Sequence, residues 1–329
     1  MSPSRTTELL RKLFKGTETQ LGDPDDTDEM PILEPITASE TVDSSQPSRH
    51  DLQVGLASDP GCVRRRNEDA GLAWQFTLAL EGQPPVAMGL FIVADGMGGH
   101  TRGEQASALA TRLLAGHVTR QICLPQLSDD EEMTEQMPIN EVLETGIRMA
   151  HQAVARRLPE AGTTMTAALV LDDGAYVAHV GDSRAYLGEL GRLQLLTKDH
   201  SVAARLVEMG QATKEEARSQ RNILYKAVGQ GVEIEPDILY HDLKWGQYLL
   251  ICCDGLWGKV SDKQISAIIE MASTPDIACQ NLVTRAKENG GEDNISVVLV
   301  ARGWPLPGRD RVRHGRPDVP QLSTADASG

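Results

Sequence analysis

Carboxylates recur along this chain in five clusters at the ends of short apolar segments, and four of these clusters contain glycine. Asp95 follows the apolar run GLFIVA and opens DGMGGH, and Asp254 follows LLICC and opens DGLWG. If the apolar runs are strands whose ends meet, these carboxylates would crowd together and raise one another's pKa values. Divalent cations that prefer oxygen ligands, Mg²⁺ or Mn²⁺, relieve that repulsion. The full set of such positions is Glu68, Asp69, Asp95, Asp182, Asp254 and Asp293.

Any single Asp-Gly pair after a strand is also ordinary turn chemistry. The recurrence of the pattern at several separate strand ends favours a metal cluster over a series of unrelated turns. Glycine beside an aspartate also lets a backbone carbonyl approach a cation closely. The sequence therefore predicts a carboxylate site for divalent cations.

Arg64 supplies a second ingredient, because it stands four residues before Glu68. A guanidinium group matches phosphate oxygens with two parallel hydrogen bonds and could hold an anion over the cations. No serine, cysteine or histidine stands out as a nucleophile, and Cys252 and Cys253 lie inside an apolar run, which favours core packing. These features together predict metal-assisted hydrolysis of a phosphate ester.

The elements that must position these residues are short strands and amphipathic helices. Apolar runs rich in β-branched residues predict strands at residues 53–58, 88–94, 164–171, 175–180, 248–253 and 294–301. Apolar residues at helical spacing predict helices around residues 106–114 and 139–147, and Ser261 with Gln264 and the pair Thr274-Pro275 mark two later helix starts. Strands in pairs with helices in blocks favour packed antiparallel sheets covered by helices over a doubly wound parallel sheet.

Composition divides the chain into a folded middle and two tails. Residues 1–50 hold ten acidic and five basic residues with one aromatic, so we expect a flexible acidic tail. Residues 303–329 are rich in Pro, Gly and Arg and are expected to form a flexible C-terminal tail. Of the net charge of −15, the folded domain expected at residues 51–302 carries −11.

The composition also excludes several classes of protein. An acidic domain with 4% aromatic residues does not fit a protein that binds nucleic acid. Five cysteines without CxxC spacing do not indicate a disulfide scaffold. No apolar run reaches the length of a membrane span and the N-terminus has no signal-type apolar core, so a cytoplasmic protein without membrane contacts is expected.

An ordered series of motifs links these observations to a known family. The series is VRRRNEDA, DGMGGH, GTTMTAALV, GDSRAY, TKDHS, CCDGLWG and GGEDNISVVLV. It resembles the motif series of the metal-dependent protein phosphatases (PPM, type 2C) in their compact bacterial form, from about residue 54 to residue 301. Each motif alone is weak, whereas the order and spacing of the whole series are specific.

The resemblance implies an α+β fold, an antiparallel β-sandwich flanked by helices on both sides in α-β-β-α layers. A binuclear centre of Mn²⁺ or Mg²⁺ would lie at one end of the sandwich. The implied enzyme is a protein-serine/threonine phosphatase that hydrolyses phosphoserine and phosphothreonine by direct attack of a metal-bridged hydroxide. The implied substrates are phosphorylated proteins, among them a Ser/Thr kinase and its targets or a phosphorylated sigma-factor regulator, and a monomer is expected.

The resemblance also implies roles for individual residues. Asp95 corresponds to the bridging metal ligand and Gly96 to a ligand through its backbone carbonyl. Asp69 would hold metal-bound water, Arg64 would bind phosphate, and Asp182 would serve a third, weaker cation. The remaining implied ligands are Glu68, Asp254 and Asp293. The segment from His200-Ser201 to about residue 235 corresponds to a mobile flap that contacts protein substrates.

The sequence departs from part of the family at the general acid. Eukaryotic members have DGH, where the histidine is thought to protonate the leaving group, whereas Met97 stands at that position here. His100 is the nearest histidine in the motif and is the candidate for this role. The alternative is that His100 begins the following helix and metal-bound water is the acid.

Two other classes of function compete with a phosphatase. A phosphatase-like regulatory binding module would have lost one or more ligands, but every expected carboxylate is present. A metal-dependent nuclease would need a basic face, which a domain charge of −11 does not favour.

Overall fold

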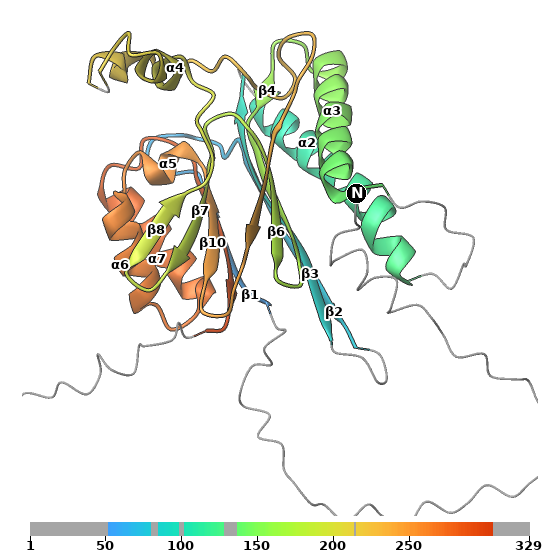
Figure 1. Cartoon of the computed structure of the whole chain (residues 1–329). Helices are drawn as coiled ribbons and strands as arrows, with labels where there is room; N and C mark the ends of the chain where they lie inside the picture. The colour runs from blue at the N-terminus through green and yellow to red at the C-terminus, as the bar shows by residue number, and fades with distance from the viewer. Residues whose placement is uncertain (1–51, 80–84, 99–101, 128–136, 214, 305–329) are drawn as a thin grey trace, which may run out of the picture.

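Two antiparallel sheets face each other, and helices cover the outer face of each sheet (Figure 1). The computed structural model describes residues 52–79, 85–98, 102–127, 137–213 and 215–304. The expected acidic tail and all but two residues of the expected C-terminal tail lie outside these residues. The two facing sheets with helices on both outer faces confirm the predicted α+β sandwich.

The sheet that holds the chain's first strand has the strand order β1-β11-β10-β7-β8. Its strands are β1 (Leu52–Asp59), β7 (Arg184–Glu189), β8 (Arg192–Leu195), β10 (Tyr248–Cys252) and β11 (Ile295–Arg302). The other sheet has the order β2-β3-β5-β6-β9, with the short β4 paired to β3. Its strands are β2 (Asp69–Leu78), β3 (Val86–Met97), β4 (Gly162–Thr163), β5 (Met165–Leu171), β6 (Gly174–Val180) and β9 (Asp237–Asp242).

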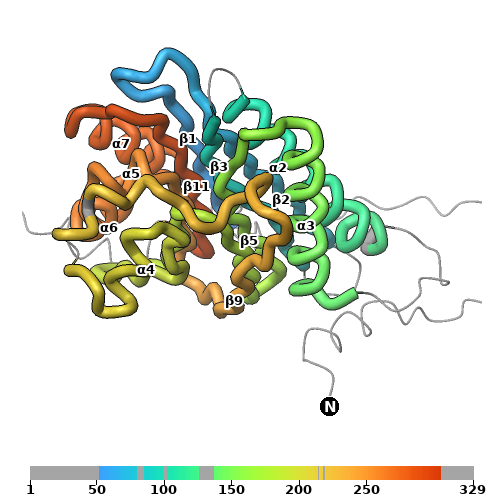
Figure 2. Tube along the Cα trace, turned by 90° about the horizontal axis from the view of Figure 1, so that it is seen from above, coloured from blue at the N-terminus to red at the C-terminus, as the bar shows by residue number. Residues whose placement is uncertain are grey.

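The helices form a separate layer on each side of the sandwich, as the view from above shows (Figure 2). On the β2–β9 sheet lie α2 (Arg102–Val118), a π-turn at Thr119–Cys123, a 3-10 turn at Leu124–Leu127 and α3 (Ile139–Arg157). On the other sheet lie α5 (Asp254–Trp257), α6 (Asp262–Met271) and α7 (Pro275–Glu288). The segment after His200 holds α4 (Val202–Glu208) and a 3-10 turn at Glu216–Gln220.

Three apolar clusters explain this layering. One fills the space between the β2–β9 sheet and α2 and α3, with Leu114, Ile147 and Leu169 at its centre. A second lies between the two sheets, and a third between the other sheet and α5 to α7. Because both faces of β3, β5, β10 and β11 are covered, these strands are continuous apolar runs and not alternating ones.

Local signals explain why the predicted elements form where they do. The six strands predicted from apolar runs are all present, and the helical spacings match α2 and α3. Ser261 and Gln264 form the capping box that begins α6, and the Thr274 side chain accepts a hydrogen bond from the Ile277 N–H at the start of α7. Each prediction of this kind rests on residues close together in the chain, so local physics decides it.

Four longer strands were not predicted: β2, β7, β8 and β9. In β2, Leu72, Trp74 and Phe76 alternate with smaller or polar residues and pack against the helix-side cluster. This period of two was the available signal for a strand with one covered face. The strand predicted at residues 88–94 was also too short, because β3 runs from Val86 through Met97 and so includes Asp95 and Gly96.

Antiparallel pairing gathers the predicted site residues at one end of the sandwich. Asp69 at the start of β2 lies opposite Asp95 near the end of β3. Cys252 at the end of β10 lies opposite Val297, close to the start of β11, so Asp254 and Asp293 lie near the same end. The strand β6 also ends there, since Val180 pairs with Met165 at the start of β5.

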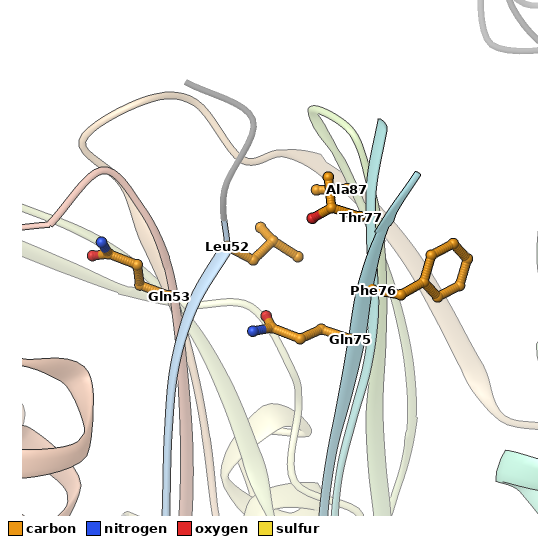
Figure 3. A pocket seen from close by; sticks show the side chains of 6 residues that line it. All are labelled: Leu52, Gln53, Gln75, Phe76, Thr77 and Ala87. Atoms are coloured by element: carbon orange, nitrogen blue, oxygen red, sulfur yellow. The ribbon is translucent and has the colours of Figure 1, made fainter. Parts of the chain in front are cut away.

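A surface pocket lies at the opposite end of the sandwich (Figure 3). Leu52 at the start of β1 and Gln75 in β2 point toward each other across it, and Ala87 at the start of β3 lies nearby (Figure 3). The residues that line this pocket carry no ionisable side chain. It therefore has none of the groups that the predicted chemistry requires.

Candidate metal centre

Asp69 and Asp95 form the centre of the acidic cluster. They face each other across the β2–β3 pair, and oxygen atoms of both carboxyl groups lie within 4.8 Å of each other and of the Cys253 sulfur. Hydrogen bonds fix the Asp95 backbone: its N–H donates to Thr164 Oγ1 at 2.8 Å, and its carbonyl accepts from the Thr164 N–H at 2.8 Å. The position of the Asp95 carboxyl group is thus set by β3 and by its neighbour Thr164.

Glu68 and Gly96 lie side by side against the first turn of α2. The Gly96 N–H donates to the Glu68 carbonyl at 3.1 Å, and Ser107 Oγ donates to the same carbonyl at 2.6 Å. A Cβ placed on Gly103 would lie 2.9 Å from the Gly96 carbonyl oxygen and 3.0 Å from the Glu68 carboxyl carbon. The Gly96 carbonyl and the Glu68 carboxyl group therefore both lie against Gly103, where a larger residue would not fit.

Burial shifts the pKa values of the clustered carboxyl groups upward. Burial raises the pKa of Asp69 to about 7, and the nearby Asp254 and Asp293 contribute in the same direction. The pKa of Asp95 lies well above its usual range because of burial and then of repulsion from Asp69 and Asp254. Burial also raises the pKa of Asp254, with a contribution from Asp293.

Several oxygens in this cluster have no hydrogen-bond partner among the described residues. Both carboxylate oxygens of Asp69 and the Oδ1 atom of Asp254 are buried and lack such a partner. A buried carboxylate without a partner is costly unless a cation compensates it. A set made only of carboxylate and carbonyl oxygens is the donor set of Mg²⁺ and Mn²⁺. The residues present therefore fit a centre of hard divalent cations.

Arg64 and Asp293 lie together at the rim of the cluster. Arg64 Nη2 donates to Asp293 Oδ2 at 2.9 Å, and the two side chains are 51% and 39% exposed. This hydrogen bond is the main cause that raises the pKa of Arg64, and Glu68 and Asp95 contribute from further away. The structure thus places a half-exposed guanidinium at the edge of the cluster, hydrogen-bonded to one of its carboxyl groups.

Asp182 is buried in the loop after β6, next to the main cluster. Burial raises its pKa to about 8, and repulsion from Asp254 contributes. Its backbone carbonyl accepts a hydrogen bond from Trp257 Nε1 at 3.0 Å. A carboxyl group at this place, close to Asp254, could hold a further cation.

Sequence reasoning missed three residues that hold the site together. Asn294 joins the loop before β2 to β11: its Oδ1 accepts from the Glu68 N–H at 2.8 Å, and its Nδ2 donates to the Arg66 carbonyl at 2.8 Å. Thr164 binds the Asp95 backbone and shares a hydrogen bond of 2.7 Å with Ser183 Oγ beside Asp182. Gly103 makes room for Glu68 and Gly96. Asn294 and Thr164 stand inside the quoted motifs, which was the available signal.

The remaining candidates differ in what the structure describes. His100 lies outside the described residues. Cys252 and Cys253 are fully buried and burial raises both thiol pKa values, so neither is an activated nucleophile.

The order of motifs and this acidic cluster agree with the result of a family comparison. A model of the family "Protein phosphatase 2C" matches residues 63–295. The chain is a member of the protein phosphatase 2C family. As such it is a protein-serine/threonine phosphatase, a phosphoric monoester hydrolase.

Bacterial serine/threonine phosphatases are among the relatives of this chain. The serine/threonine phosphatase stp of Listeria monocytogenes is 34% identical over 271 residues, which covers 79% of this chain and 99% of the relative. The S. agalactiae serine/threonine phosphatase structure has a TM-score of 0.65 at 32% identity and covers 77% of this chain and 100% of its own. The catalytic domain of the phosphatase PstP, solved in complex with two manganese ions, has a TM-score of 0.59 at 32% identity and covers 76% and 97%.

Proposed function

We propose that this phosphatase 2C hydrolyses phosphoserine and phosphothreonine in proteins at the carboxylate cluster and uses Mn²⁺ or Mg²⁺. The observation that carries the proposal is the convergence of carboxyl groups, of which both Asp69 oxygens and Asp254 Oδ1 are buried without a partner among the described residues. The manganese ions bound to the related PstP catalytic domain support the choice of cation.

The proposed ligands come from β3, from the first residue of α5 and from the loops that precede β2 and β11. Asp95 would be the ligand shared between two cations, the Gly96 carbonyl and the Glu68 carboxylate would bind beside it, and Asp69 would orient the attacking water. Asp254 and Asp293 complete the set. Two bound cations would lower the pKa of a shared water and neutralise phosphate oxygens.

The positively charged side chain of Arg64 holds the substrate phosphate. In the proposed complex the Arg64 guanidinium exchanges its hydrogen bond with Asp293 for two hydrogen bonds to the phosphate oxygens. Arg64 is half-exposed at the rim, so solvent and an incoming phosphate can reach its guanidinium group. Arg64 thereby fixes the phosphorus atom over the acidic cluster.

The wider setting is also part of the proposal. The substrates are phosphorylated proteins, including a Ser/Thr kinase and its targets. The enzyme acts as a monomer in the cytoplasm, with a catalytic domain that begins near residue 51 and extends through Trp304. Within the described ranges, no helix has the length and apolar character needed to cross a bilayer.

Metal removal tests the main proposal. Hydrolysis of a phosphothreonine peptide should require Mn²⁺ or Mg²⁺ and stop with a chelator. Asp95→Asn should lower turnover by several powers of ten, because the bridging charge is lost. Asp276→Asn, at an exposed position in α7, is the matched control and should keep full activity. Chelator-resistant activity, or a fully active Asp95→Asn protein, would contradict the binuclear site.

His100 is proposed as the general acid and has its own test. A serine or threonine alkoxide is a poor leaving group that benefits from protonation, whereas a nitrophenolate leaves without it. We expect His100→Ala to slow phosphopeptide hydrolysis far more than nitrophenyl phosphate hydrolysis. Equal effects on the two substrates would exclude His100 from this role.

A further inference from the structure

Arg184, the first residue of β7, has a guanidinium group enclosed by three side chains. Its Nε and Nη2 donate to the two carboxylate oxygens of Asp199 at 2.9 and 2.8 Å, and Nη1 donates to Tyr186 Oη at 3.3 Å. Its Cζ lies 3.6 Å from the centroid of the Trp257 ring. A guanidinium that is both forked onto a carboxylate and stacked on an indole is a geometry that lysine cannot reproduce.

The Trp257 ring connects Arg184 to two proposed metal ligands. Trp257 is the last residue of α5, whose first residue is Asp254. Its Nε1 donates to the Asp182 carbonyl at 3.0 Å, so one side chain contacts the Asp182 loop and belongs to the turn that carries Asp254. The ring therefore fixes where the Asp182 loop lies relative to α5.

Asp199 attaches the same unit to the chain that leads into α4. The next residue, His200, donates its N–H to the Gly181 carbonyl at 2.7 Å, and its Nδ1 accepts from the Gly181 N–H at 3.0 Å. The loop that carries Asp182 is thus held on one side by His200 and on the other by the Trp257 ring. Arg184 connects these two contacts of the loop. It binds Asp199, the residue before His200, and at the same time stacks on Trp257.

We propose that Arg184 is a positioning residue of the phosphatase site, which acts through the Trp257 ring on Asp182. It has no role as a ligand or acid. Its effect is to hold the indole N–H on the Asp182 carbonyl, and so to place the Asp182 carboxyl group at the separation from Asp254 that a third cation requires. The inference rests on the proposed function, in which Asp182 serves that cation.

Calorimetric titration of the full-length metal-free protein with MnCl₂ tests this inference without relying on activity. Arg184→Met keeps the length and apolar contact of the side chain but removes the fork. We expect the weak class of Mn²⁺ sites to lose about 10-fold to 100-fold in affinity, as for other residues that orient a ligand, while the tight class is unchanged. Arg184→Lys should restore only part of the loss. Arg192→Met, on the neighbouring β8 with an exposed side chain, should bind like the wild type.

Trp257→Phe provides an independent test if the arginine variant does not fold. This change keeps a ring beneath the guanidinium and removes only the N–H that reaches Asp182. We expect the same loss at the weak sites, and the double variant should lose no more than either single variant because both act along one path. In assays, the Mn²⁺ concentration for half-maximal activity should rise while kcat at saturating Mn²⁺ stays near that of the wild type.

The outcomes separate this inference from the proposed function. Weak-site affinity unchanged in Arg184→Met or in Trp257→Phe would overturn the positioning role. Equal loss at tight and weak sites together with a lower Tm would also overturn it, because a general structural role predicts that pattern. If the wild type itself binds no Mn²⁺, the proposed function fails first, and that result is visible before any variant is compared.

Discussion

At the level of single residues, the acidic cluster combines opposite demands. Asp69, Asp95 and Asp254 crowd together in a partly buried cluster, which raises their pKa values and disfavours the ionised forms that cations bind. The same burial excludes water and strengthens the attraction for a cation once it is present. We therefore infer that the site is destabilising without metal and stabilising with it.

This inference predicts how stability changes with pH. A carboxyl group whose folded pKa exceeds its unfolded value, near 3.8, binds its proton more tightly in the native state. The free energy of unfolding should then fall as pH rises from about 4 through the folded pKa values, about 7 for Asp69 and about 8 for Asp182. In excess chelator, Tm should decrease between pH 5 and pH 8.

A neutral isostere checks the cause of that decrease. Asp69→Asn should weaken the dependence of Tm on pH in chelator and raise Tm at pH 8, since the buried charge is gone. Saturating Mn²⁺ should remove most of the decrease in the wild type, because the cation keeps the carboxylates ionised at lower pH. A chelated wild type with the same Tm at pH 5 and pH 8 would contradict this account.

At the level of elements, the first turn of α2 is built to press against two ligands. Gly103 lies under both the Gly96 carbonyl and the Glu68 carboxyl group, and Ser107 one turn later binds the Glu68 carbonyl. Contact with the helix therefore determines the positions of the Gly96 carbonyl oxygen and the Glu68 carboxylate oxygens that would bind a cation. Its remaining length packs on the sheet through residues such as Ala110 and Leu114, which take no part in the site.

A pair of glycine substitutions in α2 tests this role of the helix. Gly103→Ala would bring a methyl group to 2.9 Å from the Gly96 oxygen, so we expect Mn²⁺ affinity to fall. The expected loss is about 10-fold or more, as for other changes that displace a ligand. Gly116→Ala in the same helix would meet only the flexible end of Arg120, at 3.4 Å or more.

The Gly116→Ala control should keep wild-type Mn²⁺ binding and gain up to about 1 kcal/mol of stability, because alanine favours the helix. Calorimetry and thermal melts of both variants make the comparison. Equal Mn²⁺ affinity in the two variants would show that the close contact at Gly103 does not position the ligands.

At the level of the whole molecule, the domain extends slightly beyond its predicted end. Trp304 lies outside residues 51–302, yet it is 6% exposed and packs in the cluster between the sheet and α7. Its Nε1 donates to the Ser273 carbonyl at 2.7 Å. The boundary was predicted from the composition of the C-terminal segment. Two further residues after the last strand change that composition too little to shift the predicted boundary.

Truncation tests both ends of this domain. A protein of residues 51–304 should hydrolyse phosphopeptides like the full chain. Removal of Trp304 as well should cost about 3–5 kcal/mol of unfolding free energy, the usual loss for a buried tryptophan. Thermal melts and peptide assays of the two truncated proteins provide the check. Lost catalysis in the longer one would place essential residues in the tails.

The sequence by itself determined the chemistry, the family and most of the strands. Asp95, Asp254 and Asp293 could be identified because each stands beside an apolar run that forms a strand, and such runs depend on neighbours in the chain. The prediction of hard cations needed only the residue types. The helix starts at Ser261 and Thr274 were likewise predicted, because capping is local.

Only the tertiary structure decided how these residues are held in place. The register that sets Asp69 against Asp95, and the contact of Asn294 with the Glu68 loop, join segments far apart in the sequence. The stack of Arg184 on Trp257 is of the same kind. Contacts of this range depend on how two sheets pair and pack, and no local pattern of residues encodes that geometry in a single sequence.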